Sequence, residues 1–398
     1  MAYLFFRRLK NEGEKLVRMK RTYLLLLGLG LLFLVQAGGV AWSQVTERVS
    51  VDSAGAQVDD PSYSPSISGD GRDVTFEYIS PDLVASDGNG KVDIFVHVRD
   101  FDGTGTYDEP GPGGLSTVRV SVASGGGEGS DDSHYPSISA DGMHVAFESS
   151  ANDLVAVDIN ALSDMFVHDL LGGTTTLVSV DSAGVQDPIP SSSTSPSLSS
   201  DGRYVAFQSD AVLVASDTNG IVDIFVHDRD FDGDGTYDDP GPGGISTVRV
   251  SVDSAGAQVD DPSYSPSISA DGRYVAFEST SPDLVAGDGN GKFDIFVYDR
   301  DFDGDGTYDE PGPGAPTTVR VSVASGGGEA NGDSSSSSIS ADGRYAAFVS
   351  DAPDLVAGDG NGKFDIFVHD RDFDGNGTYD EPGPGATTTV RVSVASGG

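Results

Sequence analysis

The sequence predicts an all-β protein built from repeated four-stranded units, because its composition suits short strands and its pattern recurs along the chain. Of the 398 residues, 53 are glycine and 37% are hydrophobic. Abundant glycine favours tight turns between strands over helices, although a disordered chain can share this composition. Internal repetition of the sequence indicates a folded repeat protein and not a disordered chain. An Asp-Gly pair recurs five times, with its aspartates at Asp70, Asp141, Asp201, Asp271 and Asp342.

The fourth repeat shows how each unit is organised. A short strand is expected at residues 267–269, followed by a turn of hairpin composition at 270–273. Residues 274–278 and 294–298 are rich in β-branched and aromatic side chains and predict the second and third strands. Residues 318–323 alternate apolar and polar side chains, which indicates a fourth strand.

The second repeat locates a loop. Four residues, Leu170 to Gly173, stand there in place of a ten-residue insertion that the other four repeats carry. Because the strands survive without it, the insertion must connect the third strand to the fourth. The five units cover approximately residues 52–122, 123–180, 181–252, 253–323 and 324–394.

Units of this size with four antiparallel strands predict the blades of a β-propeller. The alternative is a row of small β-sandwiches. We discount it, because about 22 strand residues per unit cannot close an independent two-sheet core.

The repeated motif resembles a known family. Pro-Ser-Ile-Ser-Ala-Asp-Gly-Arg-Tyr-Val-Ala-Phe, residues 266–277, is followed by Asp-Ile-Phe-Val-Tyr-Asp, residues 294–299. This pattern resembles the WD-like periplasmic repeat of TolB-like β-propellers, and the resemblance covers residues 46–398. It implies an extracytoplasmic propeller used for protein interaction. The long acidic insertions depart from the family pattern, and a fold by itself does not fix a function.

The number of strands does not match the number of blades. A sixth segment of the fourth-strand type, residues 46–51, precedes the first repeat, and the last repeat has its own fourth strand. Either five blades close and leave one strand over, or the chain is truncated from a larger ring. A poorly paired strand at one chain end is therefore expected, and an exposed edge permits self-association.

Residues 1–43 have the layout of a secretory signal peptide. A basic stretch leads into an apolar run at residues 23–35, and small residues at 41 and 43 precede a cleavage site before Gln44. Met19 is an alternative start. These features predict a secreted, periplasmic or cell-surface protein with a mature domain at residues 44–398. A membrane contact is expected only if the leader is retained.

The charge of the mature chain restricts its partners. Residues 44–398 hold 16 basic and 61 acidic side chains, and only three of the basic ones are lysines. Nucleic acid is excluded as a partner, because phosphate contacts need clustered cations. A protein or a polysaccharide remains as the expected partner. The chain has no cysteine, so disulfide bonds cannot stabilise it.

The ten-residue insertions predict calcium sites. The fourth repeat reads D-x-D-x-D-G from Asp301, which is the first half of an EF-hand-type loop, although Gly312 replaces the glutamate usual at position 12. Alternate carboxylates turned inward offer the oxygen ligands that Ca²⁺ requires. A solvated acidic loop is the alternative. The candidate ligands are Asp100, Asp102 and Asp108; Asp230, Asp232, Asp234 and Asp238; Asp301, Asp303, Asp305 and Asp309; and Asp372, Asp374, Asn376 and Asp380.

A second acidic pattern, D-x-N-x-x-x-D, occurs in all five repeats, as at Asp87, Asn89 and Asp93. It is open to two interpretations, a metal site or an Asx-turn before the third strand.

No catalytic motif is present. His97, His168, His227 and His369 share one repeated strand position where the fourth repeat has Tyr298, which indicates a structural role. We therefore expect a non-enzymatic, calcium-stabilised binding or scaffold module. The alternative is a hydrolase or lyase acting in the central funnel, for which His134 with Asp131 and Asp132 is the best asymmetric candidate.

Overall fold

The computed structural model describes residues 46–109, 113–160, 162–189, 191–239, 241, 243–310, 316–381 and 385–394. This part of the chain contains twenty strands and no helix, which confirms the all-β prediction. None of its segments is a helix long and apolar enough to span a membrane. The leader at residues 1–43 lies outside the described residues.

The strands form five antiparallel sheets, each made of four strands in chain order. The first sheet contains β1 (Tyr63–Ile67), β2 (Asp73–Tyr78), β3 (Asp93–Val98) and β4 (Ser116–Arg119). The second contains β5 (Ser133–Ile138), β6 (His144–Ser149), β7 (Asp164–Asp169) and β8 (Thr174–Leu177). The third contains β9 (Ser193–Leu198), β10 (Tyr204–Ser209), β11 (Asp223–Asp228) and β12 (Ser246–Arg249). The fourth contains β13 (Ser263–Ile268), β14 (Tyr274–Ser279), β15 (Asp294–Asp299) and β16 (Thr317–Arg320). The fifth contains β17 (Ser334–Ile339), β18 (Tyr345–Ser350), β19 (Asp365–Asp370) and β20 (Thr388–Arg391).

The two central strands of each sheet follow the sequence prediction closely. In the fourth sheet, β14 and β15 pair without interruption from Tyr274↔Asp299 to Ser279↔Asp294. The rings of Phe277 and Phe296 lie opposite each other with centroids 5.9 Å apart, which adds a cross-strand aromatic contact. The ten-residue insertion connects the third strand to the fourth, as the short second repeat indicated.

The first strand of each sheet is longer than the sequence indicated. In the fourth repeat it begins at Ser263 instead of residue 267, and it contains a bulge between Tyr264 and Ser267. Ser265 has a φ of 54°, which is rare for a residue other than glycine, and Pro266 has no N–H to donate. A bulge and a proline interrupt the regular alternation of side chains, so such a strand cannot be recognised from an alternating sequence pattern.

The fourth strand is shorter than expected. β16 ends at Arg320, whereas the alternation continued to residue 323. The Val321 N–H still donates to the Ile295 carbonyl at 2.8 Å, and the buried Val321 and Val323 then lead the chain towards the next sheet. The alternating valines after residue 320 therefore mark side chains buried between two sheets, and not a continuation of the strand.

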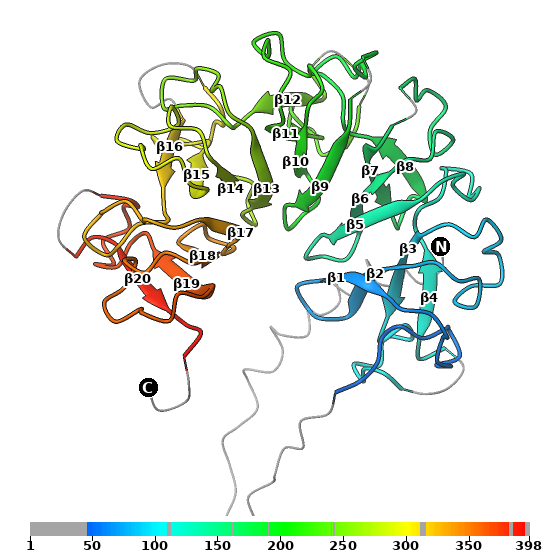
Figure 1. Cartoon of the computed structure of the whole chain (residues 1–398). Coiled ribbons are helices and arrows are strands. Elements are labelled where there is room, and N and C mark those ends of the chain that lie inside the picture. Colours follow the sequence, from blue (N-terminus) through cyan, green and yellow to red (C-terminus); the bar gives the residue numbers. More distant parts are fainter. Residues whose placement is uncertain are drawn as a thin grey trace, which may run out of the picture.

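The five sheets succeed one another around an arc, with β1, β5, β9, β13 and β17 on its inner side (Figure 1). The apolar core lies between successive sheets. Between the third and the fourth sheet, Ala206 and Val226 pack with Val275, Phe277 and Phe296, and each of these side chains is fully buried. This is the blade arrangement of a β-propeller.

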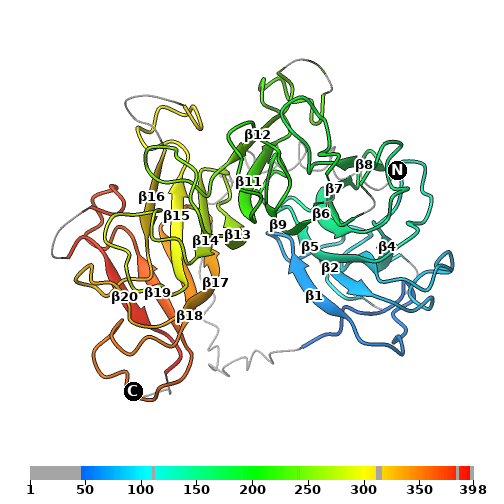
Figure 2. The ribbon, with the colours of Figure 1, turned by 45° about the horizontal axis from the view of Figure 1, so that its top comes forward.

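The first and the fifth sheet form the two ends of the arc, as Figures 1 and 2 both show. Each inner strand packs on that of the next sheet, and among the described strands no comparable packing joins β1 to β17. The face of the fifth sheet that points away from the fourth sheet is consequently not covered by another described sheet. Ile366 is 40% exposed, whereas Ile295, at the same place in the fourth sheet, is fully buried.

The segment at residues 46–51 does not form a strand, although its sequence resembles a fourth strand. Val49 packs against the core of the first sheet, and the Val51 carbonyl accepts a hydrogen bond from the Thr117 hydroxyl at 2.6 Å. The segment thus takes the place that the end of a preceding blade takes at the other junctions.

Candidate metal centres

The base of each acidic insertion is fastened by an arginine. In the loop between β11 and β12, Arg229 Nη2 lies 2.5 Å from Asp238 Oδ2, and Nε donates to Oδ1 at 2.9 Å. The Tyr237 hydroxyl donates to the Asp201 carbonyl at 3.3 Å. Burial favours the neutral acid, but the charge and hydrogen bonds of Arg229 outweigh it and hold the pKa of Asp238 below its ordinary value. The same ion pair recurs at Arg99–Asp108, Arg300–Asp309 and Arg371–Asp380.

The tips of two insertions bring three carboxylates together. One oxygen from each of Asp230, Asp232 and Asp234 lies within 4.8 Å of the others. Asp230 is buried and accepts the Gly235 N–H at 3.1 Å, while the other two aspartates are exposed. Asp301, Asp303 and Asp305 form the equivalent group in the next sheet. Each triad presents the oxygen ligands that a hard cation binds.

The fifth and the first insertion differ from these two. In the fifth, Asn376 stands with Asp372 and Asp374, its N–H donates to Asp372 Oδ1 at 2.9 Å, and its Oδ1 accepts the Thr378 N–H at 2.7 Å. In the first, Thr104 occupies the fifth position of the loop. Asp100 there is already paired, because Arg72 Nη2 lies 2.6 Å from its Oδ2.

The structure therefore divides the fifteen sequence-predicted ligands into two sets. At positions 1, 3 and 5, the third and fourth loops each bring three aspartates together and the fifth brings Asn376 to Asp372, whereas Asp100 of the first pairs with Arg72. The aspartates at position 9, namely Asp108, Asp238, Asp309 and Asp380, instead form ion pairs with the arginine that precedes the loop. An ion bound at a tip would have to complete its coordination with backbone oxygens and water.

The D-x-N-x-x-x-D pattern folds as an Asx-turn, and its two aspartates also lie close to a third carboxylate. The Lys91 N–H donates to Asn89 Oδ1 at 2.7 Å, and Asn89 Nδ2 donates to Asp93 Oδ2 at 3.3 Å, so the asparagine organises the turn. Asp87 and Asp93 are joined by Glu128 of the next repeat, and one oxygen from each lies within 4.8 Å of the others. Burial and the neighbouring Asp93 raise the pKa of Asp87 to about 6.

Glu128 is a residue that sequence reasoning missed. It lies 40 residues from Gly88, whose N–H donates to Glu128 Oε1 at 2.9 Å. A comparison of repeats offered one signal. Glu329 stands at the same place in the fifth repeat and forms the same kind of group with Asp288 and Asp294 of the fourth.

The repeated histidine is buried and hydrogen-bonded within the sheet, which is consistent with the structural role that its exchange with tyrosine predicted. His227 is 1% exposed, and its Nδ1 lies 2.9 Å from the Thr247 hydroxyl oxygen. That hydroxyl donates in turn to the Val180 carbonyl of the preceding repeat at 2.5 Å. Desolvation lowers the pKa of His227 to about 4, so the ring is neutral near pH 7.

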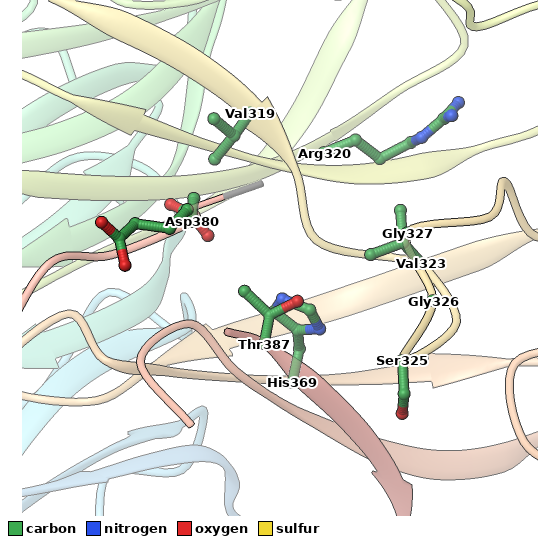
Figure 3. Close-up of a pocket in the computed structure, with 10 residues that line it drawn as sticks. Val319, Arg320, Val323, Ser325, Gly326, Gly327, His369, Asp380 and Thr387 are labelled. Atoms are coloured by element: carbon green, nitrogen blue, oxygen red, sulfur yellow. The ribbon is translucent and has the colours of Figure 1, made fainter. Parts of the chain in front are cut away.

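A cavity of about 420 Å³ lies beside the equivalent histidine between the fourth and fifth sheets (Figure 3). His369, Thr387 and Asp380 line it from the fifth sheet and its insertion, Val319 lines it from the fourth sheet, and Gly327 lines it from the segment between the two sheets. A cavity of about 600 Å³ occupies the corresponding position beside His227. Both volumes are in the range of small-ligand sites.

The asymmetric residues named from the sequence separate into two places. Asp131 pairs with Lys91 Nζ at 2.6 Å, and Asp132 accepts the Val92 N–H at 2.8 Å. His134 instead lies 3.3 Å from Glu77 Oε2, and the hydrogen bond to Glu77 raises the pKa of His134.

A further buried carboxylate in this region is Glu148 of β6. Glu148 is 8% exposed, its Oε2 has no hydrogen-bond partner, and burial raises its pKa.

The topology and the packing define the protein as a β-propeller-type, all-β protein with acidic loops. No protein-family model matches the chain, and no curated protein matches it. Among solved structures it is similar to a putative TolB from Agrobacterium tumefaciens, with 16% identity, coverage of 85% of this chain and 92% of that chain, and a TM-score of 0.41.

Two further solved structures show similarity of the same order. TolB from Acinetobacter baumannii has 14% identity, coverage of 78% of this chain and 52% of that chain, and a TM-score of 0.37. A periplasmic gluconolactonase from Pseudomonas aeruginosa has 16% identity, coverage of 85% and 74%, and a TM-score of 0.38. Similarity at this level assigns neither a family nor an activity.

Proposed function

We propose that the chain is an exported, calcium-stabilised β-propeller that acts as a binding or scaffold module for a protein or glycan partner. The observation that carries the proposal is the pair of carboxylate triads, Asp230–Asp232–Asp234 and Asp301–Asp303–Asp305, in equivalent loops of adjacent sheets. Ca²⁺ suits these positions because every side-chain ligand is an oxygen and no histidine or cysteine takes part.

The arrangement of the loop supports a stabilising role for the ion. The loop base is already fixed by ion pairs such as Arg300–Asp309, so the carboxylates at the tip are held close to one another. Three like charges within a few ångströms repel one another, and a divalent cation removes this repulsion. Calcium would therefore order the tip of a loop whose base is formed without it.

A binding role follows from the repetition. Each insertion leaves its sheet at the same place, between the third and the fourth strand, so several similar acidic loops project from successive blades. Repeated weak contacts to one extended partner gain affinity through multivalency. The basic, apolar and small-residue order of residues 18–43 supports a secreted, periplasmic or cell-surface location.

Thermal unfolding of the full mature chain at fixed ionic strength tests this proposal. Calcium should raise the melting temperature, and a chelator should remove the increase. The double variant Asp232→Ala/Asp303→Ala should show a smaller increase, whereas Asp260→Ala, which removes an exposed acid outside both triads, should keep it in full. An identical calcium response in the double variant would contradict a role for the loops.

One observation favours a second candidate function, acid–base catalysis on the inner side of the arc. The environments of Glu77 and Glu148 move their pKa values in opposite directions, down for Glu77 and up for Glu148, with His134 beside Glu77. A hydrolase or lyase of this kind would lose its activity in Glu77→Gln and Glu148→Gln. Hydrolysis of a panel of chromogenic esters, lactones and glycosides tests this catalytic function. If the native chain turns over none of them, only the binding function is retained.

A further inference from the structure

A group of three carboxylates from two successive repeats, with its two aspartates buried and its glutamate partly exposed, lies at the junction between the first and second sheets. Asp87 precedes β3 and Asp93 begins it, while Glu128 belongs to the segment that leads into β5. One oxygen from each side chain lies within 4.8 Å of the others. Asp288, Asp294 and Glu329 form the same group at the junction between the fourth and fifth sheets. Neither group includes a residue of an insertion loop.

One arginine faces each group, and it does not balance the charge. Arg119 Nη1 lies 2.5 Å from Glu128 Oε1, but 3.4 Å from Asp87 Oδ1 and 3.3 Å from Asp93 Oδ2. Charge-assisted hydrogen bonds are usually 2.7–2.9 Å long, so Arg119 is closely engaged with the glutamate only. Three ionised carboxylates and one guanidinium leave two negative charges uncompensated. One divalent cation would balance them.

A second observation, independent of this clustering, concerns the hydrogen bonds of the aspartates. The side chain of Asp87 is 1% exposed, and neither of its carboxylate oxygens accepts a hydrogen bond. Asp288, with a side chain 2% exposed, has one such oxygen, Oδ2. A buried carboxylate without hydrogen bonds is unfavourable unless another group compensates its charge. Both oxygens of Asp217 at the third junction are also without hydrogen bonds, so the third carboxylate is what distinguishes the first and fourth junctions.

We propose that Asp87–Asp93–Glu128 and Asp288–Asp294–Glu329 are partly buried divalent-cation sites of the calcium type, each of which joins one sheet to the next. All the donors are oxygens, as a hard cation requires, and the ligands come from both sides of the junction. A bound ion therefore stabilises the packing of neighbouring blades. This inference does not depend on calcium binding in the insertion loops, because the two classes of site share no residue.

The other two complete junctions provide comparisons within the same chain. At the third junction Gln258 stands in place of the glutamate, and Arg249 faces Asp217 and Asp223 alone, which leaves one negative charge. At the second junction, Gln186 Nε2 donates to Asp164 Oδ2 at 2.7 Å and to Asp158 Oδ1 at 3.2 Å, so a neutral amide bridges the two aspartates. Two negative charges also remain at the second junction, where Leu177 replaces the arginine, but only the first and fourth junctions bring three carboxylates together. The proposal therefore places ions at those two junctions.

Calcium binding to the full mature chain tests the proposal. Isothermal titration starts from the loop variant Asp232→Ala/Asp303→Ala, in which the insertion triads are broken. This variant should still bind one ion per junction group, in addition to the weaker binding of the first and fifth loops. Adding Glu128→Gln and Glu329→Gln should weaken the remaining binding by at least about tenfold, since ligand charge tunes affinity. Glutamine is the native residue at 258, so these variants are expected to fold, and circular dichroism checks that they do.

A gain of function provides the matched control. Gln258→Glu should create an additional site at the third junction, whereas Gln57→Glu, at the same place before the first sheet, should not, because no preceding pair of aspartates faces it in the described chain. Mg²⁺ in place of Ca²⁺ should bind more weakly, because it demands near-octahedral geometry. Loss of all binding in the loop variant, or unchanged binding in Glu128→Gln/Glu329→Gln, would overturn the proposal. Unchanged binding in the loop variant together with loss in the glutamine variants would instead contradict only the loop sites.

Discussion

Gly272, in the turn between β13 and β14, lies directly against the ring of Tyr204 from the preceding sheet. A β-carbon added at residue 272 would lie 2.1 Å from Tyr204 Cδ2, and the residue has a φ of +80°. The contact recurs one sheet later between Gly343 and Tyr274. The glycine of this Asp-Gly turn is therefore required for two reasons. It adopts the left-handed backbone conformation of the turn, and it leaves room for the tyrosine of the preceding blade.

This contact predicts that alanine at the same turn has different effects in different repeats. Gly272→Ala combines a left-handed backbone conformation with a steric clash, and should cost about 2–5 kcal/mol of unfolding free energy. Gly71→Ala has a similar φ of +73°, but the nearest side-chain atom, Ile67 Cδ1, lies 3.9 Å away, so only the backbone cost of about 1–2 kcal/mol remains. Urea unfolding of both variants measures the difference. Equal losses would show that the Tyr204 contact does not matter.

The open face of the fifth sheet predicts a second asymmetry between identical positions. Ile295→Ala removes a fully buried side chain between the fourth and fifth sheets, and should cost about 2–5 kcal/mol. Ile366→Ala changes a side chain that is 40% exposed, and should cost less than about 1 kcal/mol. Urea unfolding of the two variants tests this. A large loss in Ile366→Ala would mean that the face is covered in solution, by self-association or otherwise, and sedimentation would then separate these cases.

The buried histidines predict that stability falls in mild acid. Burial lowers the pKa of His97, His168, His227 and His369 to about 4, whereas a histidine in the unfolded chain titrates near 6.5. Between about pH 6.5 and pH 4 the unfolded chain therefore binds protons that the native protein does not. The contribution of these histidines to stability therefore rises with pH across this window and is lost as the pH falls through it, while the raised pKa values of Asp87 and Asp288 act in the opposite direction.

A tyrosine in place of one histidine should reduce this acid sensitivity. Tyr298 occupies the equivalent position in the fourth sheet and is 5% exposed, so the site accepts that side chain. His227→Tyr should show a smaller decrease in melting temperature between pH 7 and pH 5 than the native chain, and Tyr298→His a larger one. If the pH profiles of all three proteins coincide, proton uptake by these histidines does not control the acid response.

The four insertion loops predict a graded series of calcium sites. The third and fourth repeats keep a carboxylate at position 5, the fifth has Asn376, and the first has Thr104 with Asp100 already paired to Arg72. Affinity should decrease in that order. With dissociation constants of about 10⁻⁴–10⁻³ M, as in extracellular modules, about 1 mM calcium adds roughly 0.4–1.4 kcal/mol per site.

Substitutions at these loops check the series. Asp303→Ala and Asp305→Ala should each reduce the increase in melting temperature that calcium produces, while Thr104→Asp should enlarge it. The second repeat has no insertion and contributes no loop site. Scanning calorimetry at fixed ionic strength measures each effect. No change on addition of chelator to the native chain would mean that the loops are only solvated acids.

The sequence by itself determined the all-β class, the central strands of each sheet and the place of the insertions. These features are local: β14 and β15 follow from runs of β-branched and aromatic residues, and the turn between β13 and β14 follows from its Asp-Gly pair. The fivefold repetition reinforced each of them. A local pattern specifies the conformation of its own residues, so it can be recognised without the rest of the chain.

Only the tertiary structure decided which acidic side chains come together. The same aspartate spacing suggested Asp238 as a ligand, yet Arg229 binds it, and Asp87 meets Glu128 from the next repeat. The packing of sheets also left Ile366 exposed while burying Ile295. These outcomes depend on contacts between residues far apart in the chain, because long-range electrostatic and apolar contacts are set by how the blades pack and not by spacing along one strand.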